Sequence, residues 1–378
     1  MIRRIVFGQK LNKISDDDTL VELKDINHCK RLYQKIHCAL ESFDEVHIFF
    51  LLDKSKYIRH IIKESDSLLK VKGKLIVHAT NNKIHSSYVR SVSQIKSEIS
   101  LSIKARYHLT AQENTEKVTT IHYTKFSSSI TNADSMANWS FGIITNGSDF
   151  DLVKRLVKSI EVQNIPNYEV IISGPKFNSN NEKVKNIGDQ KAEDIRAPIC
   201  KKKNKIVKEA KFQNLAIFHA RYELPSNWYK NMKKFGNLFE ILILPTLTHE
   251  NNFRINDWSL YRRRFIAVFL PKYTFFDQDW YAQGGVIISK KRILEDVPLN
   301  ENLHWDEFED VIFSNELKIK GYTVYLDKEN HLLTTSNRIN SKNINSKLMH
   351  NLYLIRVFYS RIYIFFKNMY KYNLNKYL

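Results

Sequence analysis

The sequence predicts an α/β protein, because short buried strands alternate with amphipathic helices in two separate stretches. In the first stretch an apolar run at 45–52 precedes helical spacing of apolar residues over 57–69, and a second apolar run follows. In the second stretch a strand at 139–147 leads into a helix at 150–161, and another buried strand follows at 167–175. Strand, helix and strand in this order are typical of parallel βαβ units.

Length and composition set the broad class. The 378 residues are enough for two domains, and 43% apolar residues with 12% aromatics are ample for globular cores. Cys29, Cys38 and Cys200 lack metal-type spacing, so we expect reduced thiols and a cytoplasmic protein. The first residues lack the apolar core of a signal peptide, and no apolar run is long enough to cross a bilayer.

A formal net charge of +19 favours a polyanionic partner: nucleic acid, an anionic membrane surface or a phosphorylated substrate. No helix-turn-helix, zinc or RNA-binding motif accompanies the charge. We therefore expect no specific nucleic-acid partner.

The chain divides into three predicted regions: 1–135, 136–340 and 341–378. A polar stretch of small residues, 126–138, has the composition of a linker. Within the first region, 44–82 resembles the second half of a class I methyltransferase-like Rossmann domain, in which a helix ends in a Leu-Leu-Lys-x-x-Gly turn before a strand. The glycine-rich loop of that family is missing, since only Gly8 and Gly73 occur there. We predict a degenerate Rossmann-like lobe with a structural or docking role.

The second region resembles the GT-A glycosyltransferases in five blocks that occur in the family's order. These blocks are the βαβ opening at 139–175, the helix at 199–210, the strand at 214–219 running towards Trp228, the glycine pair at 283–292, and the acidic block at 304–314 before Gly321. The resemblance implies a GT-A type domain over 136–340 that takes a nucleotide-diphosphate sugar, a UDP-sugar first of all. We expect a bacterial glycan acceptor, either a surface polysaccharide or a lipid-linked glycan.

Glycosyl transfer needs a base for the acceptor hydroxyl and a positive charge for the leaving diphosphate. By resemblance to inverting enzymes, the base is Asp310 or Glu309 in the acidic block; the alternative is that these acids only favour a helix N-terminus. The resemblance implies further site residues, which are Thr145, Asn146, Asp194, Lys203 and Asn204 for the donor, and Gly284, Gly285 and Trp305 for the acceptor. Trp305 has a core position as its alternative.

The chain departs from the family at His219-Ala-Arg221, where acidic residues usually hold Mn²⁺ or Mg²⁺. Three hypotheses follow. Arg221, with the lysines near Lys202, neutralises the diphosphate without a metal; His219 and His331 bind a metal; or the donor site has been lost. The last is compatible with a non-catalytic scaffold of a glycan-biosynthesis complex, which is the alternative function.

The last region, 341–378, is predicted to be a basic amphipathic helical tail. No Asp or Glu follows Glu329, and lysines and arginines alternate with aromatic residues. Such a composition suits an interfacial helix on an anionic membrane, the alternative being a helix packed on the preceding domain. We therefore expect a peripheral membrane enzyme on the inner face of the membrane.

Overall fold

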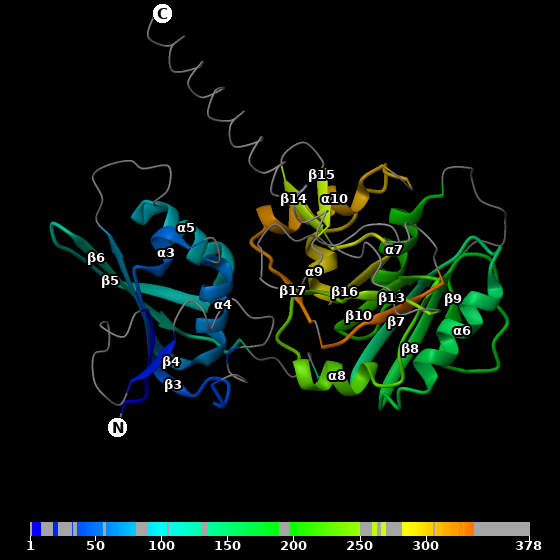
Figure 1. The fold of residues 1–378 in the computed structure, drawn as a ribbon, viewed down its shortest axis with the longest axis horizontal. Helices are drawn as coiled ribbons and strands as arrows, with labels where there is room; N and C mark the ends of the chain where they lie inside the picture. The colour runs from blue at the N-terminus through cyan, green and yellow to red at the C-terminus, as the bar shows by residue number, and fades with distance from the viewer. Residues whose placement is uncertain are drawn as a thin grey trace, which may run out of the picture.

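The structure is a computed structural model, and Figure 1 shows its fold. It describes residues 2–8, 18–21, 32, 36–55, 58–80, 90–103, 106–129, 135–188, 197–249, 259–262, 266–269, 282–304, 307–327 and 329–335. Two mixed sheets with helices on their faces confirm the predicted α/β class. One sheet ends before residue 126 and the other begins at Asn138, while the boundaries at 135 and 340 stay predictions.

The first sheet has six strands in the order β2-β1-β3-β4-β6-β5. Neighbours from β2 to β4 pair in parallel, whereas β6 pairs antiparallel with both β4 and β5. Its elements are β1 (Arg4–Phe7), β2 (Thr19–Val21), β3 (Phe43–Phe49), α3 (Leu51–Lys54), α4 (Ile58–Leu68), β4 (Leu69–Thr80), α5 (Val92–Ile103), β5 (Tyr107–Asn114) and β6 (Val118–Lys125).

Two details of the first region correct the sequence predictions. The strand predicted at 45–52 ends at Phe49, because Phe50 adopts a left-handed conformation and α3 begins at Leu51. The turn predicted before the next strand lies inside β4. Lys72 has a positive φ of 69° there, and the register of β4 with β3 shifts between Leu69 and Lys74, so the extra residues form an irregularity within the strand.

The second sheet has seven strands in the order β17-β12-β16-β10-β7-β8-β9. Only β16 runs antiparallel to its neighbours among these described strands. The strands are β7 (Asn138–Ile144), β8 (Asn167–Ser173), β9 (Val184–Asn186), β10 (Asn214–His219), β12 (Ile241–Ile243), β16 (Val286–Lys290) and β17 (Val324–Leu326). The helices are α6 (Phe150–Glu161), α7 (Ile199–Glu209), α8 (Trp228–Phe235), α9 (Lys291–Asp296) and α10 (Glu309–Ile319).

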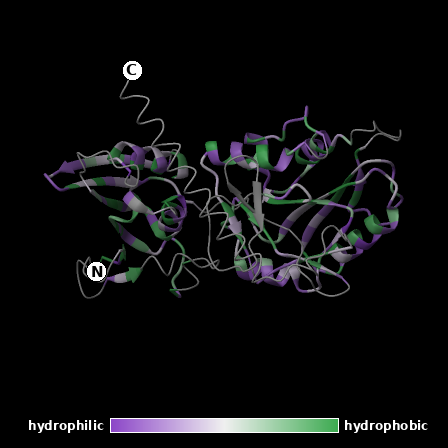
Figure 2. Cartoon of the chain, turned by 45° about the horizontal axis from the view of Figure 1, so that its top comes forward, coloured by the Kyte–Doolittle hydropathy of each residue, from purple (hydrophilic) through white to green (hydrophobic). Residues whose placement is uncertain are grey.

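Helices cover both faces of the second sheet because β7 is apolar on both sides. Trp139 and Phe141 join a core with α6 and α8, and the rings of Trp139 and Trp228 lie 5.1 Å apart. Gly142 points to the other face, where a Cβ would come within 2.5 Å of the Ile206 side chain of α7. The helices accordingly carry both hydrophobic and hydrophilic residues (Figure 2), and apolar residues such as Val153 and Leu156 of α6 are buried.

Two small sheets complete the described fold. The first, ordered β11-β18-β13, contains Tyr222–Glu223, Leu332–Thr334 and Thr246–Thr248; the second pairs β14 (Ser259–Arg262) with β15 (Ile266–Phe269). Among the described helices, none is both long enough and apolar enough to pass through a bilayer. The predicted tail, 341–378, lies outside the described residues.

Candidate functional site

The order of the second sheet marks one place where a ligand is expected. From β7 the chain moves outwards to β8 and β9, and then returns to the other side of β7 to form β10. The gap between the carboxyl ends of β7 and β10 is thus a topological switch point, where open α/β sheets bind ligands. Thr145 and His219 stand at these two strand ends, and both are residues that the sequence singled out.

The loop after β7 is a tight polar turn. The Thr145 hydroxyl accepts a hydrogen bond from the Gly147 amide at 3.0 Å, and the Asn146 side chain accepts one from the Ser148 amide at 3.1 Å. Gly147 has a φ of +87°, which glycine adopts readily. The buried Lys202 ammonium of α7 donates to the Thr145 carbonyl at 2.6 Å. The loop is therefore fixed from beneath, while Asn146 is exposed.

The end of β10 carries a cation. The Arg221 guanidinium lies 3.1 Å from Nδ1 of His219, and its Cζ lies 5.0 Å from the centre of the Tyr222 ring. The Arg221 carbonyl accepts hydrogen bonds from the Thr334 hydroxyl at 3.2 Å and the Thr335 amide at 3.3 Å. The backbone of this turn is thus held by β18, and the guanidinium has a defined position.

Two glycines join this cation to a pair of carboxylates. The Gly285 carbonyl accepts the His219 amide at 3.0 Å, and a Cβ at Gly285 would lie 2.8 Å from the Arg221 guanidinium. The Gly284 amide donates to Asp310 Oδ2 at 3.1 Å, and a Cβ on Gly284 would collide with a Glu309 carboxylate oxygen. The glycine pair is needed because charged groups pack closely on each side of it.

A buried lysine completes the cluster. Lys203 of α7 is 1% exposed, donates to the Gly284 carbonyl at 2.8 Å, and lies 3.7 Å from Glu309 Oε1. Burial lowers the pKa of Lys203, while the facing Glu309 carboxylate opposes that effect. Burial raises the pKa of Glu309; Lys203 opposes this and the Asp310 charge adds to it.

Asp310 is held more rigidly than Glu309. Its Oδ1 accepts its neighbour's Val311 amide at 2.8 Å, while Oδ2 accepts the Gly284 amide. Burial raises the pKa of Asp310, and these amide donors counteract part of the rise. Both acids also lie in the first turn of α10, where the helix dipole favours a negative charge. A fixed carboxylate with a raised pKa is better suited to accept a proton than an exposed one.

Asn204, another predicted donor residue, contacts the loop after α9. Asn204 bonds to the backbone of Leu299 in both directions, at 2.8 and 3.1 Å, and to Glu301 at 3.0 Å, so it fastens the loop after α9. Its role in donor binding stays a prediction. Asp194 and Trp305 lie outside the described residues.

The two predicted metal ligands are not brought together by any described contact. Strand β18 is antiparallel to β11, with Leu333 opposite Glu223 and Thr334 opposite Tyr222. His331 therefore lies at the end of this pairing that is away from Arg221. Burial lowers the pKa of His331. Within the described ranges no group of three His, Cys, Asp or Glu side chains is arranged to hold a metal ion.

The tautomer of His219 also fits a metal poorly. Nδ1 must accept the hydrogen bond that the Arg221 guanidinium donates, which leaves the proton of the neutral ring on Nε2. A protonated nitrogen cannot ligate a metal, and the fixed positive charge beside the ring opposes a cation. The described residues therefore suit an anion at this position better than Mn²⁺ or Mg²⁺.

One titratable residue at the same edge of the sheet escaped sequence reasoning. Asp327 directly follows β17, is 3% exposed, and accepts the Glu329 amide at 3.0 Å. Burial raises its pKa to about 6. A single aspartate after a short strand gives no periodic signal, so only the fold reveals it.

Comparison with known proteins gives a partial likeness. No family model matches the sequence, and no curated protein matches it. Structures of TarS from S. aureus are similar to part of the chain. TarS 1–349 is 13% identical with a TM-score of 0.37, covering 52% of this chain and 60% of that one. Its complexes with UDP-GlcNAc and with UDP are each 14% identical, with TM-scores of 0.39 and 0.38, and cover 54% and 53% of this chain and 60% of TarS 1–349.

The chain thus spans about three fifths of the length of TarS 1–349. A likeness with this identity and TM-score carries no argument about function, so the function must be argued from the residues of the site.

Proposed function

We propose that the chain is a glycosyltransferase that uses a nucleotide-diphosphate sugar and works without a metal at the diphosphate. The observation that carries this proposal is the joining of Arg221 to Asp310 and Glu309 by the Gly284–Gly285 pair, beside the switch point of an open α/β sheet. A cation for a leaving phosphate and a carboxylate for an acceptor proton are the two groups that glycosyl transfer requires.

The chemistry assigns one role to each side of the glycine pair. The acceptor hydroxyl attacks the anomeric carbon, its proton passes to Asp310, and the bond to the diphosphate breaks. Negative charge then grows on the phosphate oxygen, which Arg221 meets with a planar, permanently charged donor. Attack from the face opposite the leaving group gives inversion, which matches a single base.

Glu309 has a supporting part in this proposal. Its carboxylate faces the buried Lys203 ammonium at 3.7 Å, so its charge is partly matched within the protein. Asp310 has both oxygens oriented by backbone amides, which leaves the carboxylate in one defined direction. We therefore favour Asp310 as the base and Glu309 as the group that tunes it.

The remaining parts of the proposal concern partners. We infer a glycan or lipid-linked acceptor and a peripheral position on an anionic membrane, because the basic aromatic composition of 341–378 suits such a surface. UDP-GlcNAc is the first donor to try and UDP the first nucleotide product, since TarS structures contain them. The donor sugar itself follows from the experiment.

A thermal-shift screen tests donor binding. The purified chain is heated with UDP, GDP, CMP and their sugar conjugates, each with Mn²⁺ and with EDTA, because a ligand of the native state raises its apparent stability. We expect one nucleotide family to stabilise the protein equally in Mn²⁺ and EDTA. Stabilisation that disappears in EDTA would overturn the metal-free donor site. No response to any nucleotide would favour the non-catalytic scaffold instead.

A further inference from the structure

The six-stranded lobe contacts the second sheet's domain around one short segment, 318–325, which connects α10 to β17. Described residues of α4 and α5 reach this segment and Glu240 beside it. The side chains of Arg59, His60 and Lys63 contact Lys318, Tyr325 and Glu240, and the backbone of Leu101 lies against Gly321. This segment directly follows the helix whose first turn carries Glu309 and Asp310.

One of these contacts is at the C-terminal end of α10. The Arg59 guanidinium donates to the Lys318 carbonyl at 2.5 Å, and Glu98 of α5 holds the same guanidinium at 2.7 Å. The Lys318 carbonyl also accepts the Gly321 amide at 3.1 Å, and a cation at the last carbonyls of a helix matches the negative end of the dipole. Arg59 and Glu98 are 22% and 26% exposed, so water screens this arrangement only partly.

The turn after α10 is built to lie against the first lobe. Gly321 has a φ of +80°, and the Tyr322 amide donates to the Leu317 carbonyl at 2.9 Å, as in a Schellman helix end. A Cβ on Gly321 would lie 2.5 Å from the Leu101 carbonyl of α5, so the two backbones touch here. A larger residue at this turn would push α5 away.

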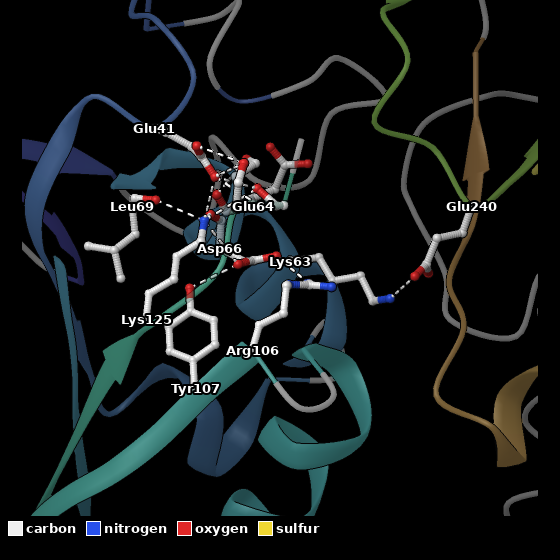
Figure 3. A network of polar contacts seen from close by, with 12 residues as sticks. Glu41, Lys63, Glu64, Asp66, Leu69, Arg106, Tyr107, Lys125 and Glu240 are labelled. Carbon is white, nitrogen blue, oxygen red and sulfur yellow. Dashed lines mark hydrogen bonds and ion pairs between the residues drawn. The ribbon is translucent and has the colours of Figure 1, made fainter. Parts of the chain in front are cut away.

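A buried ion pair closes the contact on its other side. Lys63 of α4 pairs with Glu240, and Figure 3 shows the lysine reaching across to it. Glu240 also accepts the Thr323 amide at 2.8 Å through its second oxygen. The rings of His60 and Tyr325 lie 5.7 Å apart beside this pair. Lys63 is 9% exposed at its side chain, so breaking the pair would leave a poorly solvated charge.

Apolar packing makes the contact continuous. One cluster of buried residues contains Ile61, Ile99 and Ile103 from the first lobe together with Phe313 and Leu317 of α10. Phe313 and Leu317 of α10 thus belong to an apolar cluster that extends into the first lobe. Such a helix transmits a displacement at one end to the other, because packed interiors deform little.

We propose that the first lobe is a positioning element of the transferase site, in which Arg59 fixes the C-terminal end of α10 and thereby the direction of Asp310 at its other end. The helix of 11 residues spans about 16 Å between these ends. This inference rests on the proposed function and names Arg59 as a positioning residue, since it touches no substrate. It also gives the first lobe a role that needs no methyl transfer.

The test compares Arg59→Ala with Arg59→Lys, Glu98→Gln and a matched control, Lys70→Ala, which removes an ion pair with Asp44 inside the first lobe. For Arg59→Ala we expect kcat to fall about tenfold with KM for the donor unchanged, because a small misplacement of a base slows chemistry without loosening binding. Arg59→Lys should recover part of the loss, Glu98→Gln should produce a milder loss, and Lys70→Ala should keep the wild-type kcat.

Hydrogen exchange supplies a readout that is independent of activity. The amides of 309–319 should exchange faster in Arg59→Ala than in the wild type, and those of α6 should not. An active Arg59→Ala with wild-type kcat and unchanged exchange in α10 overturns the positioning role. Faster exchange in α10, in a protein whose wild type binds no nucleotide, would keep the mechanical link and sink the proposed function instead.

Discussion

Two buried lysines, one in each sheet region, differ in how completely their polar surroundings satisfy them. Lys125, which is 0% exposed, donates to Glu41 at 2.9 Å, to the carbonyls of Asp66 and Leu69 at 2.7 and 2.9 Å, and to Ser129 at 3.3 Å (Figure 3). Lys203, which is 1% exposed, donates to one carbonyl at 2.8 Å and has its nearest carboxylate, Glu309, at 3.7 Å.

The acids respond differently in the two places. Burial alone would raise the pKa of Glu41, but the bonds from Lys125 and the Ser129 amide hold it below the ordinary value. Burial raises the pKa of both Glu309 and Asp310, and Lys203 opposes the rise only in part. A saturated cluster keeps its charges fixed, whereas an unsaturated one leaves carboxylates able to take up a proton.

The largest effect should come from removing the base. Asp310→Asn keeps the shape and an acceptor for the Gly284 amide but cannot take the acceptor's proton, so we expect kcat to fall by about a hundredfold or more. Single-turnover rates at saturating donor measure this. Glu309→Gln should cost less. A fully active Asp310→Asn would contradict the assignment of the base.

Replacing each of the two lysines by methionine should affect stability and activity differently. Lys125→Met removes the ammonium that pairs with Glu41 and one of the two cations beside Asp66, which keeps Arg106. It should lower the free energy of unfolding by about 3 kcal/mol, with activity per folded molecule unchanged. Lys203→Met should destabilise less, because Glu309 can stay protonated, yet should reduce activity strongly. Urea unfolding and kcat measured on the same two samples would reveal the contrast, and equal losses of both kinds would remove it.

The pH profile sharpens the same contrast. A base must be ionised to act, so kcat should rise with pH through the raised pKa of the Glu309 and Asp310 pair. The apparent value belongs to the pair and not to one residue. Replacing Lys203 by methionine should move this rise to higher pH, since the ammonium lowers the pKa of both acids. If the Lys203→Met variant has the same pH profile as the wild type, Lys203 does not set the pKa of the acid pair.

Asp327 gives the smallest predicted effect and concerns stability. Its pKa is about 6 in the folded protein and lower in the unfolded chain, so the native state binds more protons between these values. Its contribution is full below the unfolded pKa and is lost as pH rises through about 6. Asp327→Asn should therefore raise the free energy of unfolding at pH 8 by up to about 2 kcal/mol and have little effect at pH 4. Chemical denaturation at both values checks this.

The sequence predicted most of the second region because its signals are local. Helix 150–161 and the strand at 167–173 follow from apolar spacing, and α10 begins with the two acids that were singled out. The Gly284–Gly285 pair was selected through resemblance to a family. What no local pattern contains is the way in which His219, Asp310 and Lys203 meet around those glycines, because they come from different elements.

The first region was harder to predict for the same physical reason. The irregularity at Lys72 and the helix beginning at Leu51 depend on pairing with distant strands. The contact of Arg59 with Lys318 joins residues 259 positions apart, and no periodicity marks it. In the sequence alone, Arg59 is indistinguishable from a charge on a solvated helix face, and only the fold reveals its contact with Lys318.

The most direct test of the metal-free diphosphate site uses isothermal titration calorimetry in EDTA. It measures how tightly three proteins bind the nucleotide selected by the thermal screen. These are the wild type, Asp310→Asn and Arg221→Ala. We expect Asp310→Asn to bind the nucleotide as the wild type does but to transfer sugar about a hundredfold more slowly or worse, and Arg221→Ala to bind at least tenfold more weakly. Equal binding by Arg221→Ala and the wild type would contradict the metal-free diphosphate site.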